Sequence, residues 1–153
     1  MLEGKWTYRS YRNDSDFVGK DAATALAQIM DEGVLDLEMR STDMFGGGLG
    51  LGQNHALSLE GKLLGGDPVQ FSMIGIGIAG TPTAGWRYHY HGQLGFGWPS
   101  GVDQIPSLVG TVVRVVAHGD HAPAGVTASF IAVQHRNPPQ PRLRRRSALT
   151  IGL

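Results

Sequence analysis

The stretch WRYHYHG, residues 86–92, decides how the rest of the chain is interpreted. In a β-strand successive side chains point to opposite faces, so the three aromatic residues would share one face. The arginine and the two histidines would share the other face. The aromatic face resembles the wall of a small-molecule site, whereas His89 and His91 have the spacing of a pair of metal ligands. The neighbouring strands must show which face lies inside the protein.

The segments that read as strands elsewhere in the chain share one pattern. Over residues 2–11, apolar side chains and charged side chains alternate, with Leu2, Trp6 and Tyr8 on one face. The segments at 33–41 and 54–64 alternate in the same way. Since charged faces lie in solvent, the same rule places the tyrosines of 86–92 inside and the histidines outside.

Eight segments of the chain have the pattern of β-strands, and turn signals rich in glycine and proline separate them. Short links favour antiparallel pairing of neighbours, and eight such strands are best closed into a barrel. The sequence therefore predicts an all-β fold, an eight-stranded antiparallel up-and-down barrel with one short helix after the first strand. A two-sheet sandwich is the alternative. The predicted strands are 2–11, 33–41, 43–51, 54–64, 68–79, 85–97, 108–118 and 125–135.

The helix is predicted from the segment DAATALAQIMDEG, residues 21–33. Asp21 suits the start of a helix and Gly33 suits the position after its end. We expect about ten helical residues, within 20–31, lying across one mouth of the barrel. The apolar stripe that would face the barrel is Ala23, Leu26, Ala27 and Met30.

Length and composition limit the class of protein. A chain of 153 residues suits one domain with a single core, and the absence of cysteine excludes disulfides and thiolate metal sites. The first ten residues lack the apolar core of a signal peptide, and no run of about 18 apolar residues occurs. We therefore expect a cytoplasmic protein.

The balanced formal charge hides an asymmetry along the chain. Residues 136–153 hold five arginines and no acid, which leaves eight basic against thirteen acidic residues in positions 1–135. We expect a barrel domain over residues 1–136 and a disordered Pro- and Arg-rich tail over 137–153. An acidic body without a basic stripe does not suit nucleic acid, and we expect neither a nucleic-acid nor a membrane partner.

The opening LEGKWTY, residues 2–8, carries Gly4 and Trp6 in a Gly-x-Trp arrangement. This arrangement resembles the first strand of lipocalins and, more closely, of avidin-type biotin binders, which are calycin-like barrels. The resemblance implies an eight-stranded up-and-down barrel that holds a small ligand, with Trp6 closing the floor or lining the cavity. It implies no particular ligand.

The inward faces predict a binding site for a small hydrophobic or aromatic ligand, with no cofactor. A core filled by its own side chains is the alternative, although glycines at 46, 48, 75, 77 and 95 suggest open volume. The predicted lining is Trp6, Tyr8, Met39, His55, Phe71, Met73, Trp86, Tyr88, Tyr90, Phe96 and Phe130.

The same interior could serve a cofactor-free isomerase or cyclase. His55 would shuttle a proton, and a tyrosine would hydrogen-bond a developing enolate. The candidate tyrosines are Tyr8, Tyr88 and Tyr90. A structural or assembly module is the third interpretation.

Two further sites are weaker predictions. His89 and His91, completed by His118 or His121, could bind a metal ion, although their strand face is assigned to solvent. Residues 74–78 and 109–116 are apolar on both faces, which predicts a homodimer through the outer strand surfaces.

Overall fold

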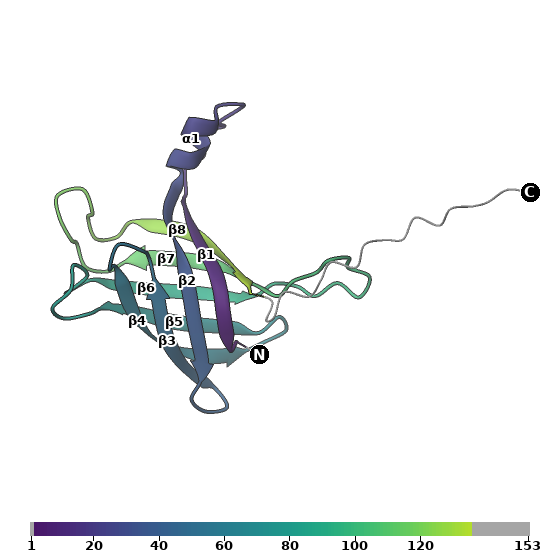
Figure 1. The fold of residues 1–153 in the computed structure, drawn as a ribbon. Coiled ribbons are helices and arrows are strands. Elements are labelled where there is room, and N and C mark those ends of the chain that lie inside the picture. The colour runs from purple at the N-terminus through teal and green to yellow at the C-terminus, as the bar shows by residue number, and fades with distance from the viewer. Residues whose placement is uncertain (1, 136–153) are drawn as a thin grey trace, which may run out of the picture.

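The structure, a computed structural model, describes residues 2–135 and folds them into a closed barrel of eight antiparallel strands (Figure 1). Each strand pairs with its neighbours in sequence, and the first pairs with the last, so the predicted up-and-down barrel is confirmed and the sandwich is wrong. The predicted tail, 137–153, lies outside the described residues. The strands are β1 Gly4–Arg12, β2 Ile29–Met39, β3 Met44–Gly50, β4 Ala56–Gly65, β5 Gln70–Gly77, β6 Arg87–Leu94, β7 Ser107–Arg114 and β8 Thr127–Gln134.

The up-and-down order gives the barrel two different ends. The odd-numbered strands finish at one end, which we call the mouth, and the even-numbered strands finish at the other, which we call the base. Closure is continuous along β1 and β8, from Trp6 opposite Gln134 near the base to Arg12 opposite Ala128 at the mouth.

The alternation of side chains assigns the faces as predicted. Trp6, Tyr8, Tyr88 and Tyr90 are buried inside, while the histidines of β6 are exposed outside. The sequences of β5 and β7 are apolar on both faces and do not show which face lies inside. In the structure, each of these strands directs one apolar set inward. The inward side chains on these strands include Phe71, Met73, Leu108 and Val112.

Glycines inside the barrel admit neighbouring side chains and do not leave open volume. Gly61 lies opposite Phe45, and a Cβ at Gly61 would stand 2.2 Å from the Phe45 ring. A Cβ at Gly75 would stand 3.1 Å from Leu57, and one at Gly77 only 1.6 Å from the Thr83 carbonyl oxygen. The expectation that glycines mark an empty interior is therefore wrong at Gly75 and Gly77.

Helix α1, Ala22–Ala27, is shorter than predicted and does not cover the mouth. Asp21 caps it by accepting hydrogen bonds from the backbone N–H groups of Ala23 and Thr24. No helical residue is buried, and Leu26 is 67% exposed. Figure 1 shows the helix standing away from the barrel at the end of the extended β1–β2 hairpin.

The cross-strand pairing of this hairpin explains the difference. Ile29 pairs with Tyr11 and Asp31 pairs with Ser10, so β2 begins where the helical pattern was expected to continue. Met30 consequently packs against the barrel core from β2 and not from a helix. Within residues 2–135, no helix is long and apolar enough to cross a membrane.

The contact between Gly61 and Phe45 predicts a local limit on side-chain size. Gly61→Ala should lower the free energy of unfolding by about 1 to 3 kcal/mol, because the buried Phe45 ring must move in a packed core. Urea unfolding measures the difference. Gly50→Ala is the matched control, since nothing lies within 4 Å of a Cβ there, and it should change stability by no more than about 0.5 kcal/mol. Equal losses in the two variants would contradict this account of the packing.

Candidate functional site

A groove of about 540 Å³ lies at the mouth, between the β1–β2 hairpin and the segment that joins β7 to β8. Its volume lies within the range of small-molecule sites, roughly 300–1,000 Å³. Arg114, the last residue of β7, is half-buried and contributes to the wall. The lining residues are Arg12, Asn13, Asp14, Ser15, Met30, Arg114, His121, Pro123, Val126 and Thr127.

A second, much smaller hollow lies inside the barrel next to the groove, and Met30 lines both. The hollow has a volume of about 10 Å³, which is about the minimum that holds one water molecule. The tyrosine rings around it are packed, with Tyr8 edge to face against Tyr90 at 6.4 Å between centroids. A ligand that binds this end must therefore occupy the mouth. The hollow is lined by Tyr8, Met30, Asp31, Leu49, Leu51, Leu57, Tyr88, Tyr90 and Val112.

A hydrogen-bonded trio stands at the mouth. Tyr88 Oη lies 2.5 Å from His118 Nε2 and accepts a hydrogen bond of 3.1 Å from Arg114 Nε. Tyr88 and Arg114 are cross-strand partners on β6 and β7, so the barrel itself sets their relative position. Arg114 Nη1 also donates to the Pro123 carbonyl oxygen, which ties the β7–β8 segment to the barrel wall.

An aromatic stack adjoins this trio. The His118 ring lies on the Trp86 ring, with 3.8 Å between centroids and 13° between the planes. His55 approaches Trp86 from the β3–β4 side, at 5.6 Å between centroids. The mouth therefore holds a stacked pair of rings beside a hydroxyl group and a guanidinium group, and His118 covers one face of Trp86.

The protonation of these groups follows from their burial. Burial, helped by the nearby Arg114 charge, lowers the pKa of His118 below its ordinary value. The imidazole is therefore neutral at neutral pH, and Nε2 can accept the Tyr88 proton. Burial raises the pKa of Tyr88, of Tyr8 and of Tyr90. All three phenols consequently keep their protons.

Asp31 faces the same space from β2. Burial raises the pKa of its carboxyl group, and the charges of Arg114 and His55 partly oppose the effect. Asp31 and Arg114 thus place a carboxyl group and a guanidinium group at the rim of the mouth.

The structure divides the predicted lining residues into three groups. Tyr8, Tyr88 and Tyr90 surround the inner hollow, and Trp86 and His55 are half-buried at the mouth. Met39 is half-buried at the base end of β2 and is not part of the mouth. The remaining inward residues fill the core and line neither the groove nor the hollow. These core residues are Trp6, Phe71, Met73 and Phe130.

The prediction that Phe96 lines the interior is wrong. Strand β6 ends at Leu94, so the alternation that placed Phe96 inside stops before reaching it. Phe96 is exposed at the base and packs edge to face on Trp98, with 4.8 Å between ring centroids.

None of the ten residues that line the groove was predicted as a ligand-site candidate, and Asp31 and His118 were missed as well. Arg114 follows the inward Val112 by two positions, so strand alternation alone could have placed it inside. Asp31 was assigned to the helix. His118 was considered only as a metal ligand, and its contact with Trp86 joins segments that are far apart in the sequence.

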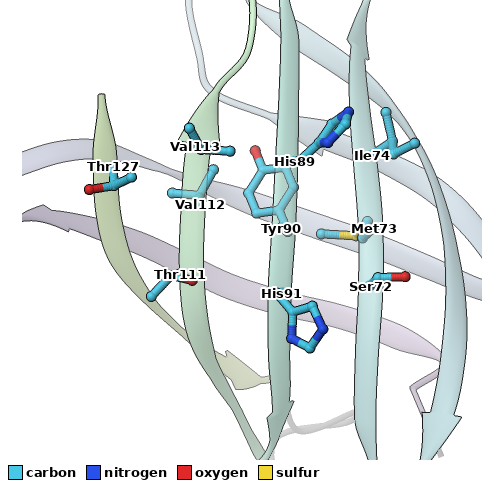
Figure 2. Close-up of a pocket in the computed structure, with 10 residues that line it drawn as sticks. All are labelled: Ser72, Met73, Ile74, His89, Tyr90, His91, Thr111, Val112, Val113 and Thr127. Atoms are coloured by element: carbon cyan, nitrogen blue, oxygen red, sulfur yellow. The ribbon is translucent and has the colours of Figure 1, made fainter. Parts of the chain in front are cut away.

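The two histidines of β6 lie on the outer face, apart from the mouth. Figure 2 shows His89 and His91 beside side chains of β5 and β7, in a surface groove of about 330 Å³. His89 accepts a hydrogen bond of 3.2 Å from Arg87 Nε, and His118 bonds Tyr88 on the opposite face. Within residues 2–135, no cluster of three or more His, Cys, Asp or Glu side chains suits a metal ion.

Apolar side chains also reach the outer surface of this part of the barrel. Ile76, Ile78 and Val115 are exposed, and Ile74 and Val113 line the outer groove. The homodimer through residues 74–78 and 109–116 stays a prediction.

Comparison with known proteins gave no relative for this chain, since no family model, curated protein or solved structure matches it.

The burial of Asp31 predicts a particular pH dependence. Its pKa is raised in the folded protein, so its contribution to stability is greatest below the ordinary value of 3.8 and is lost as the pH rises through the folded pKa. Asp31→Asn replaces the carboxyl group with an amide that does not titrate, so the variant does not lose this stability as the pH rises. The free energy of unfolding of the variant, relative to the unaltered protein, should therefore increase in urea titrations as the pH rises above the ordinary value of 3.8.

The control for this measurement is Asp36→Asn, which alters an exposed carboxylate on the outer face of the same strand. A pH-dependent gain of the same size in both variants would show that the effect does not come from the mouth.

Proposed function

We propose that this protein binds a small planar aromatic molecule with a hydrogen-bond acceptor, and that it does so at the mouth of the barrel. The proposal rests on one observation, the contacts that the His118 ring makes with both Trp86 and Tyr88. The imidazole stacks on the indole and presents an acceptor nitrogen to the phenol. A ligand with the same shape and the same acceptor would satisfy both groups.

The location of His118 in a connecting segment supports this proposal. The residue belongs to no strand, since it lies between β7 and β8 in a segment with positive φ angles at Gly119 and Gly125. A ligand could therefore stack on Trp86 in place of the imidazole while every strand pair of the barrel stays intact. Trp86 and Tyr88, by contrast, are held by β6 and its entry turn.

The charges of the mouth narrow the class of ligand. Arg114 lines the groove and already donates to Tyr88, so a carbonyl or carboxylate group on the ligand would find a donor there. The aromatic ring would then lie toward Trp86, and its polar edge would lie toward Arg114. This arrangement suits an aromatic acid or a heteroaromatic carbonyl compound better than a hydrocarbon.

The resemblance of the first strand to calycin-like barrels agrees with a ligand at the open end. Kinship with lipocalin- or avidin-type proteins is part of the proposal, as is a cytoplasmic location. Because the inner hollow is about 10 Å³, we propose binding across the mouth in place of the deep cavity that the resemblance implies.

A second candidate function is proton transfer without a cofactor. The short distance between Tyr88 Oη and His118 Nε2, 2.5 Å, favours it. In an isomerase or cyclase, Tyr88 would donate to a carbonyl oxygen as an enolate forms, and neutral His118 would supply the base. Tyr8 and Tyr90 would act only from the hollow behind, and His55 would be a neighbour of the site.

The binding proposal predicts a difference between ligands with and without an acceptor. The Trp98→Phe variant keeps two tryptophans, Trp6 and Trp86. Trp86 is the one at the mouth, because Trp6 is fully buried toward the base. Benzimidazole should change its fluorescence on binding. Tyr88→Phe should weaken benzimidazole by about 2- to 13-fold, equal to about 0.5–1.5 kcal/mol, and leave naphthalene unchanged.

The matched control for this titration is His89→Ala, which alters the outer face of the same strand and should leave both affinities unchanged. The proposal fails if neither compound affects Trp86 emission up to its solubility limit, or if His89→Ala weakens benzimidazole more than Tyr88→Phe does.

The catalytic alternative predicts exchange of acidic C–H protons. With 2-tetralone as a probe in deuterated water, NMR should detect exchange next to the carbonyl group faster than in buffer. His118→Ala should lower the added rate by about a hundredfold, in the range expected for a general base. An unchanged rate in that variant would exclude His118 as the base.

A further inference from the structure

The segment between β6 and β7, residues 95–106, carries an exposed apolar tip at the base. Phe96 is 58% exposed, Trp98 is 66% exposed and Val102 is 79% exposed. Asp103 is the one charged residue in the segment. Figure 1 shows the segment reaching away from the barrel.

The tip is held in a defined shape. The side chain of Gln104 accepts a hydrogen bond from Trp98 N, at 2.5 Å, and donates to Trp98 O, at 3.0 Å. Gly101 N also donates to Trp98 O, and Gly95 N donates to Ser107 O at the start of the segment. These bonds hold the backbone of Trp98 although its ring contacts only Phe96 among the aromatic residues described. The exposure of the two rings is therefore a feature of an ordered turn.

The basic part of the chain begins beside this segment. Gln134 N donates to Pro106 O, and His135 N donates to Lys5 O. Strand β8 therefore ends next to Pro106, the last residue of the segment that carries the aromatic tip. The sequence that follows His135 contains five arginines and no acidic residue, namely Arg136, Arg142, Arg144, Arg145 and Arg146. Aromatic and cationic groups thus originate from the same end of the barrel.

We propose that the base of the barrel docks on a lipid surface that contains anionic headgroups. Phe96, Trp98 and Val102 would enter the interfacial layer, where indole and phenyl rings are favoured. The arginines after His135 would add electrostatic attraction to the anionic headgroups. Each signal alone gives weak and reversible attachment, whereas the two together give stable attachment. This partner differs from the sequence-based expectation of no membrane.

A bilayer suits these observations better than other partners do. A single-stranded nucleic acid would use the arginines and stack on the rings, but it would not cover the aliphatic Val102. An apolar pocket of another protein would accept the tip, but it would leave five arginines without a role. A lipid surface provides an apolar layer and anionic groups in the same plane.

The test uses the full chain and vesicle co-sedimentation. Vesicles of phosphatidylcholine with about 30% phosphatidylserine should bind the protein, and vesicles of phosphatidylcholine alone should bind it much more weakly. Replacing both rings, Phe96→Ser with Trp98→Ser, should weaken binding to the anionic vesicles by at least about tenfold. Replacing Arg142, Arg144, Arg145 and Arg146 with Gln should reduce binding to the level seen on neutral vesicles.

Phe17→Ser is the matched control, because Phe17 is fully exposed on the β1–β2 hairpin at the opposite end. It should leave vesicle binding unchanged. The proposal is overturned if the protein ignores anionic vesicles, if Phe17→Ser has the larger effect, or if an oligothymidylate of about 20 nucleotides binds the protein and competes it off the vesicles. The benzimidazole titration probes the other end of the barrel, so either proposal can fail without the other.

Discussion

The pairing of β1 with β8 is the constraint on which the rest of the structure depends. It removes the last free strand edges and encloses one side-chain set from every strand. Charged residues such as Lys5 and Arg9 then face water, and Trp6 and Tyr8 face the axis. Closure also fixes the position of the mouth, because Arg114 and Tyr88 meet as cross-strand partners where β7 ends and β6 begins.

The filled interior determines where chemistry can occur. Large rings meet across the axis, as Phe45 meets Phe71 and Phe71 meets Phe130, and a glycine lies where a ring needs room. Polar groups that would be costly in such a core lie where the strands end. The mouth combines fixed groups from the strands with a ring from a connecting segment. The proposed binding would use this division, since the strands would hold the geometry and the connecting segment would supply the ring that a ligand replaces.

The sequence predicted the structure correctly where the positions of side chains follow a local period. Alternation separates Tyr88 and Tyr90 from the histidines, because neighbouring residues of a strand face opposite sides. Alternation gave the wrong position for Phe96, because the residue at which β6 ends depends on its backbone hydrogen bonds with β7. Met30 and Asp31 fit a helical pattern equally well, and only pairing with the end of β1 makes them part of a strand. The stack of His118 on Trp86 joins two turns, which no local pattern relates. Most of the fold was thus predictable, whereas the lining of the groove and the His118 stack were not.

The start of β1 and the end of β8 lie next to each other. His135 N bonds to Lys5 O at 2.7 Å, and Trp6 stands opposite Gln134, so the beginning of β1 and the end of β8 are neighbours in one ladder. A short linker could join them, and the chain could then be opened at another turn without changing any strand pair. The barrel therefore has no obligatory first strand. Circularly permuted versions should keep the same mouth, and they would allow new termini to be placed beside it or far from it.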